Sequence, residues 1–549
     1  MKFENVNQMK RIAFYTLLGI LSLSAVGCQD LAVENNNAPD RTVAFAQPGD
    51  VVNLVKGTFA NYWLSIQNCG NGALFFSTLA DENSSSWANW GMRDMSSEPR
   101  IAWDNSSTYS RASSTREPWF DTYRGISNAN DALQAITRAE EEESVENNIF
   151  TREGYDTARL KAFAKMNQGL MHGTLSLIFD QAFIVDETVD LENDALELRP
   201  YMEVNQAAIE MLEGARAIAQ AGSFSFTAAE DWIWGLDVSS DDMVKLINSF
   251  IARLTVQVAR DESERAAVNW SEVISRVDAG ITEDFSPIGD DDGTTEWDCL
   301  KFYGQNGTTW SRADYRTIGP ADESGGYSAW LAKPLGERLV FDIATADRRI
   351  VGDATDLSVD GSDFQYQGNN GPFPAARGVY HYSSHNHKRY QYYNQGNANG
   401  AMPHMIMAEM DMYKAEALLR TNGSTSVVAD LINKTRVSRG MLNPAAATDA
   451  PGSSTDAQSH MDSASLWAKL KHERRIETFQ TWAGLAYYDD RGLGDLVTGT
   501  PIHFPVPGRE LETLGLQSYT FGGVGGTGGA PVAYQRDDYL KDSDNARPR

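Results

Sequence analysis

The chain has 549 residues, of which 42% are hydrophobic and 22% are charged. This length and balance exclude a disordered chain and can bury a large core, as one big domain or two intimate ones. Acidic residues outnumber basic residues by 75 to 47, which gives a net charge of −28. Nucleic acid is excluded as a partner because its phosphates would be repelled. The negative charge therefore favours neutral ligands. Alternatively, the acidic surface serves only to keep an exported protein soluble.

The N-terminus has the pattern of a bacterial lipoprotein signal. Lys10 and Arg11 precede an apolar run over residues 12–23, and the small residues 24–27 lead into Cys28. A transmembrane helix needs about 20 apolar residues, so this run is too short to span a bilayer and is typical of a cleaved segment. We predict lipid attachment at Cys28; in an ordinary secretory signal, that cysteine would be incidental.

The predicted organisation has three parts. A signal peptide covers 1–27, with translation starting at Met1 or Met9. Polar, turn-prone residues then form an extended tether over 28–48, because they include too few apolar side chains to bury. A single large domain is predicted for 49–549.

Two further cysteines, Cys69 and Cys299, follow Cys28. An exported protein in an oxidising compartment permits one disulfide between them. Two buried free thiols fit the sequence equally well, so the pairing stays open at this point.

Amphipathic helices are predicted in two blocks, over about 119–284 and 404–497, because apolar residues recur there at three- and four-residue spacing. The helices expected within the blocks are 119–133, 162–177, 201–221, 243–259, 270–281, 405–419, 427–439 and 465–481. Successive helices of this length pack most simply as antiparallel pairs. We therefore predict a mainly α fold in which helix pairs stack into a curved scaffold.

Two stretches outside the helix blocks are rich in Gly, Asn and Ser and also in aromatic residues. The longer one, 285–402, separates the blocks, and the other covers 68–118. Loops this long inside a compact protein are functional or disordered, and their aromatic content argues against disorder. We predict that these two stretches form a binding face.

Several motifs resemble those of the SusD/RagB family. They are Trp119-x3-Tyr123-x2-Ile126-x3-Asn130, Ala408-Glu409-x2-Met412-x-Lys414-Ala415-Glu416-Ala417, Ile432-Asn433-x2-Arg436-x2-Arg439-Gly440, Glu473-Arg474-Arg475-Ile476-Glu477 and Phe504-Pro505-Val506-Pro507-x2-Glu510-Leu511. Each motif alone is unspecific, but their order and their coverage of nearly the whole chain resemble the family.

The resemblance implies a TPR-like helical fold and a cell-surface lipoprotein without enzymatic activity. Such a protein captures oligomeric nutrients and passes them to a SusC-like TonB-dependent barrel in the outer membrane, acting as a lid on its mouth. Glycans are the family's usual cargo, and peptides or other polymers are the alternative. A surface glycoside hydrolase or an adhesin is a further alternative.

The predicted ligand contacts lie in the two loop-rich stretches. Sugar rings stack on Trp and Tyr, and their hydroxyls need amides, carboxylates and guanidinium groups nearby. The predicted contacts are Trp87, Asn89, Trp90, Asp81, Arg93, Trp310, Tyr327 and Trp330. The alternative is that these aromatic residues fill a second small core beneath the loops.

Metal and catalytic sites receive less support. His381, His385 and His387 could bind a metal if helical, but their neighbourhood is typical of a loop or strand, which favours polar surface histidines. No cofactor is predicted; residues 290–293, Asp-Asp-Asp-Gly, suggest calcium but lack the spacing of an EF-hand loop. The sequence contains no Gly-x-Ser-x-Gly, His-Glu-x-x-His or phosphate-loop motif, so no enzyme is predicted.

Most charged residues of the motifs are interpreted as scaffold. We expect Glu416 to pair with Arg436 across neighbouring helices, and Arg474, Arg475 and Glu477 to form ion pairs near helix ends. Exposed pairs of this kind contribute only about 0 to 1 kcal/mol each. Asn130 is predicted to be a buried hydrogen-bonding residue rather than a ligand contact.

Overall fold

The structure is a computed structural model that describes residues 47–85, 89–191, 193–290, 295–305, 311–368 and 382–523, together with the backbone of 532–533. The predicted signal peptide, nearly all of the tether, Cys28, Trp87, Trp310 and His381 lie outside these residues. The chain divides into two units, Met1–Asp50 and Val51–Arg549, and the fold is that of the second. No helix in the described part of the chain is long and apolar enough to cross a membrane.

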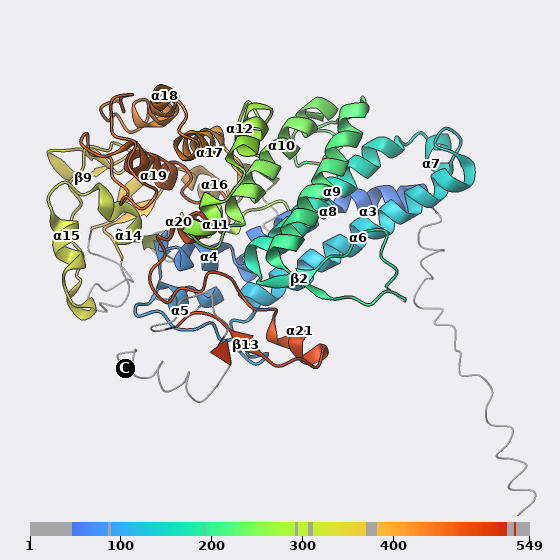
Figure 1. The fold of residues 1–549 in the computed structure, drawn as a ribbon, viewed down its shortest axis with the longest axis horizontal. Coiled ribbons are helices and arrows are strands. Elements are labelled where there is room, and N and C mark those ends of the chain that lie inside the picture. Colours follow the sequence, from blue (N-terminus) through green and yellow to red (C-terminus); the bar gives the residue numbers. More distant parts are fainter. Residues whose placement is uncertain are drawn as a thin grey trace, which may run out of the picture. The chain divides into compact units, whose positions relative to one another are not determined.

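The first helix block packs in chain order, each long helix against the next (Figure 1). Its long helices are α6 (Ser113–Glu143), α8 (Thr157–Ile178), α9 (Tyr201–Ala221), α10 (Ser240–Gln257) and α12 (Trp270–Asp278). The shorter α7 (Ile149–Arg152) and α11 (Glu262–Ala266) lie between them in the chain. These bounds confirm most predicted helix ends of this block to within a few residues. Helix α6, however, begins six residues before Trp119 and ends ten residues after Leu133, and α8 begins five residues before Ala162.

Helix α8 is the centre of the first block, and two of its glycines allow its neighbours to approach closely. A Cβ atom at Gly169 would lie 2.8 Å from Leu212 of α9, and one at Gly173 would lie 2.7 Å from Leu254 of α10. Any larger residue would force these helices apart. The N-terminus of α8 is closed by Asp156, whose carboxylate accepts the backbone N–H groups of the first turn.

Helix α3 (Pro48–Gln67) was not predicted. Its buried apolar residues nevertheless recur at helical spacing, and they are Val51, Val55, Phe59, Tyr62, Trp63 and Ile66. The short α4 (Ala73–Leu79) follows, and all of its residues are buried. The first predicted loop stretch therefore starts with core structure rather than with surface.

The second helix block contains α17 (Met407–Arg420), α18 (Thr425–Arg436), α19 (Leu466–Glu477) and α20 (Leu485–Leu493). Helices α17, α18 and α19 contact one another around a shared apolar cluster, and α17 also contacts α12 of the first block. The predicted helix over 465–481 ends earlier, at Glu477. Gln480 has a φ of 55°, in the left-handed region, so the backbone leaves the helix before that position.

Every sheet in the described residues is a two-stranded antiparallel pair, which confirms the mainly α fold class. The pairs are β1 (Asn83–Ser84) with β7 (Arg312–Ala313), β2 (Gln181–Phe183) with β3 (Leu198–Pro200), β4 (Ser225–Phe226) with β5 (Val238–Ser239), β6 (Ile288–Asp290) with β12 (Asn399–Ala401), β8 (Val351–Asp353) with β9 (Asp356–Asp360), β10 (Phe364–Tyr366) with β11 (His385–His387), and β13 (Tyr519–Thr520) with β14 (Val532–Ala533). Short helices complete the loop-rich stretches: η1 (Cys69–Asn71), η2 (Asn89–Gly91), α5 (Met92–Ser96), α13 (Cys299–Tyr303), α14 (Tyr315–Ile318), η3 (Gly319–Ala321), α15 (Gly326–Leu331), η4 (Leu335–Glu337) and α16 (Gln391–Gln395), with α21 (Gly508–Thr513) near the C-terminus.

The ion pairs that Glu416, Arg474 and Glu477 form are buried, which corrects the expectation of exposed pairs. Glu416 accepts hydrogen bonds from Arg265 at 2.8 and 3.0 Å and from Arg474 at 2.6 Å, and its side chain is 0% exposed. Burial alone would raise the pKa of Glu416, but the charges of Arg265 and Arg474 hold it below its usual range. The predicted partner Arg436 instead donates to the carbonyl oxygens of Asn443 and His460.

The structure confirms that Asn130 is a buried hydrogen-bonding residue. Its amide N–H donates to the carbonyl oxygen of Val185 at 3.0 Å, and its carbonyl oxygen accepts from Gln168 at 2.6 Å. The side chain is buried, so both ends of the amide are used inside the protein.

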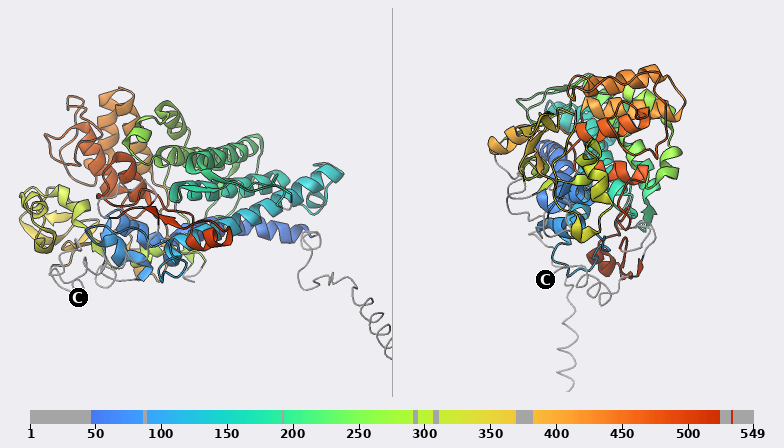
Figure 2. Two further views of the ribbon diagram at one scale, coloured as in Figure 1. Left: turned by 60° about the horizontal axis from the view of Figure 1, so that its bottom comes forward. Right: turned by 90° about the vertical axis from the view of Figure 1, so that its left-hand side faces the viewer.

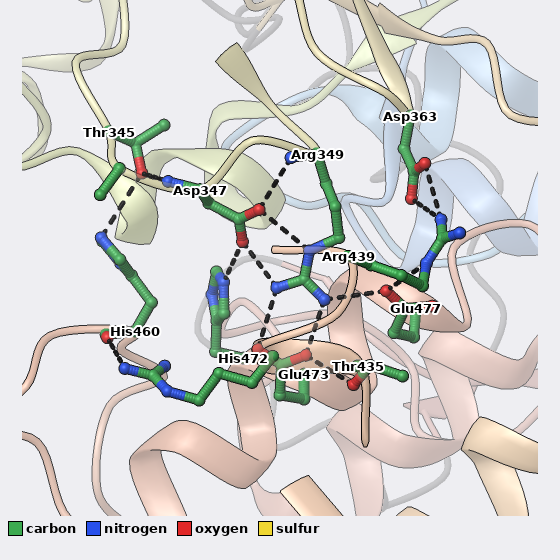
Figure 3. A network of polar contacts seen from close by, with 12 residues as sticks. Thr345, Asp347, Arg349, Asp363, Thr435, Arg439, His460, His472, Glu473 and Glu477 are labelled. Atoms are coloured by element: carbon green, nitrogen blue, oxygen red, sulfur yellow. Dashed lines mark hydrogen bonds and ion pairs between the residues drawn. The ribbon is translucent and has the colours of Figure 1, made fainter. Parts of the chain in front are cut away.

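A second buried network joins the long insertion to α19 (Figure 3). The guanidinium of Arg349 donates to Asp347 at 2.7 and 2.9 Å, to Glu473 at 2.6 and 2.9 Å and to Glu477 at 2.8 Å. These four side chains are at most 1% exposed. Arg439 extends the network by bridging Glu477 to Asp363. The insertion is thus attached to the helical scaffold by charge as well as by apolar contact.

Candidate ligand-binding surface

The two loop-rich stretches meet, as the prediction of one binding face requires. Strands β1 and β7 pair Asn83 with Ala313, and the backbone N–H of Asp314 donates to the carbonyl oxygen of Glu82 at 3.1 Å. Arg316 adds a two-point ion pair to Glu98 at 2.6 and 2.9 Å. Figure 2 shows the corresponding blue and yellow segments at the same end of this unit.

Four aromatic rings from the two stretches gather at this junction. Trp90 of η2 lies 5.9 Å from Tyr303 of α13, measured between ring centroids. Trp297 lies 6.3 Å from Tyr303 and 6.0 Å from Phe302, which itself lies 4.9 Å from Tyr303. Trp297 is 9% exposed, whereas the other three rings are half-buried. We call these four residues the aromatic surface.

Helix α13 carries two of these rings and is held by a disulfide, a helix cap and a buried ion pair. A disulfide between Cys69 and Cys299 ties its first residue to η1, which answers the question that the sequence left open. Asp298 caps the helix by accepting the N–H of Lys301 at 3.0 Å, and it also accepts from Gln67 at 2.9 Å. The Lys301 ammonium lies 2.9 Å from Asp298 and is fully buried. A five-residue helix would not hold its shape alone, so these contacts fix it.

Trp90 is held in an unusual backbone conformation. Its φ is 50°, in the left-handed region that non-glycine residues seldom adopt, and its carbonyl oxygen accepts from the Ser114 hydroxyl at 2.7 Å. Two predicted polar contacts flank it in the chain: Asn89 is half-buried, and the Arg93 side chain is 33% exposed and hydrogen-bonded to Asp94. An amide and a guanidinium therefore lie in the same loop as a half-buried indole ring.

Two other predicted contacts, Trp330 and Asp81, are core residues, which corrects their assignment to the binding face. Trp330 is 2% exposed and belongs to an apolar cluster, and Tyr327 stacks on it with ring centroids 5.9 Å apart. Asp81 is buried and paired with Arg100. The alternative of a second small core beneath the loops therefore holds for Trp330. Tyr327 packs against that core but is half-buried, so its contact with ligand stays a prediction. Trp87 and Trp310 lie outside the described residues and stay predictions.

Sequence reasoning did not select Trp297, Phe302 and Tyr303 as ligand contacts. The sequence shows only that these aromatic residues bracket Cys299, and the structure adds that Cys299 is bonded to Cys69, 230 residues away. A long-range cross-link beside a cluster of aromatic residues indicates a loop that is held in place.

His385 and His387 of the insertion are buried, not on the surface as predicted. His385 and His387 lie on β11 and are 0% exposed, and the ring of His387 packs 4.5 Å from Phe479. Burial lowers the pKa of His385 to about 4, so it stays neutral near pH 7. No group of three or more metal-binding side chains occurs among the residues that the structure describes.

No protein-family model and no curated protein matches the sequence. Solved structures do match the fold. A SusD superfamily protein from Bacteroides vulgatus aligns with a TM-score of 0.53 at 13% identity, covering 85% of this chain and 97% of that one. A surface glycan-binding protein A from Bacteroides uniformis aligns with a TM-score of 0.52 at 13% identity and the same coverage. A SusD-like carbohydrate binding protein from Bacteroides vulgatus aligns with a TM-score of 0.50 at 15% identity, covering 81% and 83%. The chain has the fold of the SusD superfamily.

Proposed function

We propose that this protein binds glycans through its aromatic surface. The observation that carries the proposal is the anchored set of half-buried rings, Trp90, Phe302 and Tyr303, at the junction of two loops far apart in the chain. Two proteins with the same fold are described as binding carbohydrate or glycan, which supports this ligand class.

The chemistry of the surface suits a sugar. Pyranose rings present an apolar C–H face that stacks on an aromatic ring, and Asn89 and Arg93 offer donors for hydroxyl groups. Rings that are already fixed lose little conformational entropy on binding, so more of the contact energy appears as affinity. The net charge of −28 disfavours strongly anionic polymers and favours neutral glycans.

Replacing Trp90 or Tyr303 with alanine is expected to weaken glycan binding by about tenfold or more, because each ring supplies a stacking platform. Isothermal titration calorimetry against panels of neutral oligosaccharides and of peptides measures the effect. Tyr155→Ala, which removes a half-buried ring after α7, is the control and should leave affinity unchanged.

Wild-type affinity that survives in both Trp90→Ala and Tyr303→Ala would remove the aromatic surface from the site. Selective binding of the peptide panel would establish the alternative cargo. A surface hydrolase differs from both, because it would release new reducing ends from a bound oligosaccharide, and an adhesin would bind neither soluble panel.

The second part of the proposal concerns the anchoring of the protein at the outer membrane and its transporter partner. Lipid attached to Cys28 would hold the domain at the outer membrane, beside a TonB-dependent transporter that takes up the ligand. Tethering raises the effective concentration of the two proteins for each other, so a weak contact suffices.

Cys28→Ser is expected to move the protein from the membrane fraction to the soluble fraction, because the lipid is its predicted anchor. Gentle detergent extraction of the wild type should co-purify a large TonB-dependent barrel, detected by mass spectrometry. Repeated failure to recover a barrel would reject the partner while leaving the glycan proposal standing.

A further inference from the structure

A separate pocket lies on the first helix block, where the start of α10 faces the chain that follows α12. Its volume is about 130 Å³. Its apolar lining residues are buried or half-buried and form the floor; they are Leu236, Val238, Leu246, Ile281 and Phe285. Its polar lining residues are exposed, apart from the half-buried Lys245, and form the rim; they are Asp237, Asp242, Lys245, Thr282, Glu283 and Asp284. No residue of the aromatic surface lines it.

The rim carries an excess of negative charge. The Lys245 ammonium lies 2.9 Å from Asp242 and neutralises that carboxylate. No described basic side chain forms an ion pair with Asp237, Glu283 or Asp284, so three negative charges remain around the opening.

Two of these carboxylates are held in place by backbone groups. Asp237 accepts the N–H of Ala228 at 2.7 Å, and Asp284 accepts the N–H of Met407 at 2.7 Å. Glu283, which lines the same pocket, is exposed and forms no hydrogen bond with any described residue. The rim is therefore partly pre-arranged, and one carboxylate is available to turn toward a ligand.

We propose that this pocket binds the side chain of a lysine presented by a partner polypeptide. The aliphatic stem of lysine would cover the apolar floor, and its ammonium would reach the three carboxylates at the rim. An anionic group would be repelled here, and a purely apolar group would leave the carboxylates unused. This site is independent of the proposed glycan surface, since the two share no residue.

The probe for this site is Nα-acetyl-lysine N-methylamide, titrated against the mature protein by saturation-transfer NMR. We expect it to bind, and we expect the norleucine analogue, which has a similar aliphatic stem but no charge, to bind about tenfold more weakly. Raising the sodium chloride concentration from about 20 mM to about 500 mM should weaken binding of the lysine probe, because exposed charges are screened.

Glu283→Gln should reduce affinity for the lysine probe by roughly three- to fivefold, as expected for one partly exposed charge. Glu142→Gln is the matched control: it removes the same charge from an exposed position of α6, which does not line the pocket, and should leave affinity unchanged. Equal binding of the norleucine analogue, no binding of the lysine probe, or an unchanged affinity in Glu283→Gln would overturn the proposal. None of these outcomes affects the glycan proposal, whose ligands and variants are different.

Discussion

Replacing Arg349 with methionine is expected to lower the free energy of unfolding by about 3–5 kcal/mol, the cost of removing one partner from a buried ion pair. The reason is that Arg349 is the shared donor for Asp347, Glu473 and Glu477, which have at most 1% of their side chains exposed. Asp347 would keep its contact with His472 at 2.8 Å, but it would lose the two-point guanidinium contact. Chemical denaturation followed by circular dichroism measures the change.

The same variant should change the response to acid. Burial by itself raises the pKa of Asp347, but the charge of Arg349 and the hydrogen bond from His472 more than reverse this, so its native pKa lies below its usual range. A carboxylate with a lowered native pKa contributes stability above its unfolded pKa of about 4, and that contribution is lost as the pH falls below it. Arg349→Met should therefore lose less stability than the wild type on acidification below pH 4.

The control for this prediction is Arg199→Met. Arg199 also pairs with a carboxylate, Glu203, at 2.8 Å, but both side chains are nearly half exposed. Solvent screening makes such an exposed pair contribute far less to stability than a buried one. Equal destabilisation by Arg199→Met and Arg349→Met would mean that burial of the network is not the source of its strength.

Removing the disulfide is the second large change. Cys69→Ser is expected to lower the free energy of unfolding by about 2–5 kcal/mol, because the bond closes a loop of 230 residues in the unfolded chain. Cys299→Ser should have a similar effect, and the double variant should cost little more than either single one, since each substitution breaks the same bond.

The disulfide variants also test how the aromatic surface is built. Without the bond, α13 keeps its cap at Asp298 but loses its covalent tie to η1, so Phe302 and Tyr303 should be less well fixed. We expect weaker glycan binding measured by calorimetry at a temperature where the variant is still folded. Additive destabilisation by the two cysteine substitutions, or unchanged binding in both, would contradict this role.

Helix positions were the most predictable part of the fold. Helices α8, α9, α17 and α18 follow local periodicity, and the predicted bounds agree with the structure to within a few residues outside the first turns of α8. Local spacing carries this information because one face of each helix is buried along its whole length. The Asn130 prediction succeeded for a similar reason, since a polar residue within an apolar helix face requires internal partners.

Pairing across the chain was not predictable from local patterns. Glu416 could have paired with any of several nearby basic residues, and the structure shows Arg265, Arg420 and Arg474 rather than Arg436. His385 and His387 look polar in sequence, yet β11 buries them within the insertion, where their rings pack against other aromatic rings.

The aromatic residues show most clearly which features can be predicted from the sequence and which depend on the fold. Their number and their concentration in two loop-rich stretches were visible in the sequence, and so was the likeness of the motifs to a nutrient-binding family. Whether a given ring faces ligand or core depends on contacts between segments more than 200 residues apart, such as β1 with β7 and Cys69 with Cys299. Trp330 is buried where the insertion packs against Ile476 and Phe479, whereas Trp90 and Tyr303 are half-buried, because burial is a property of the folded packing and not of the residue type.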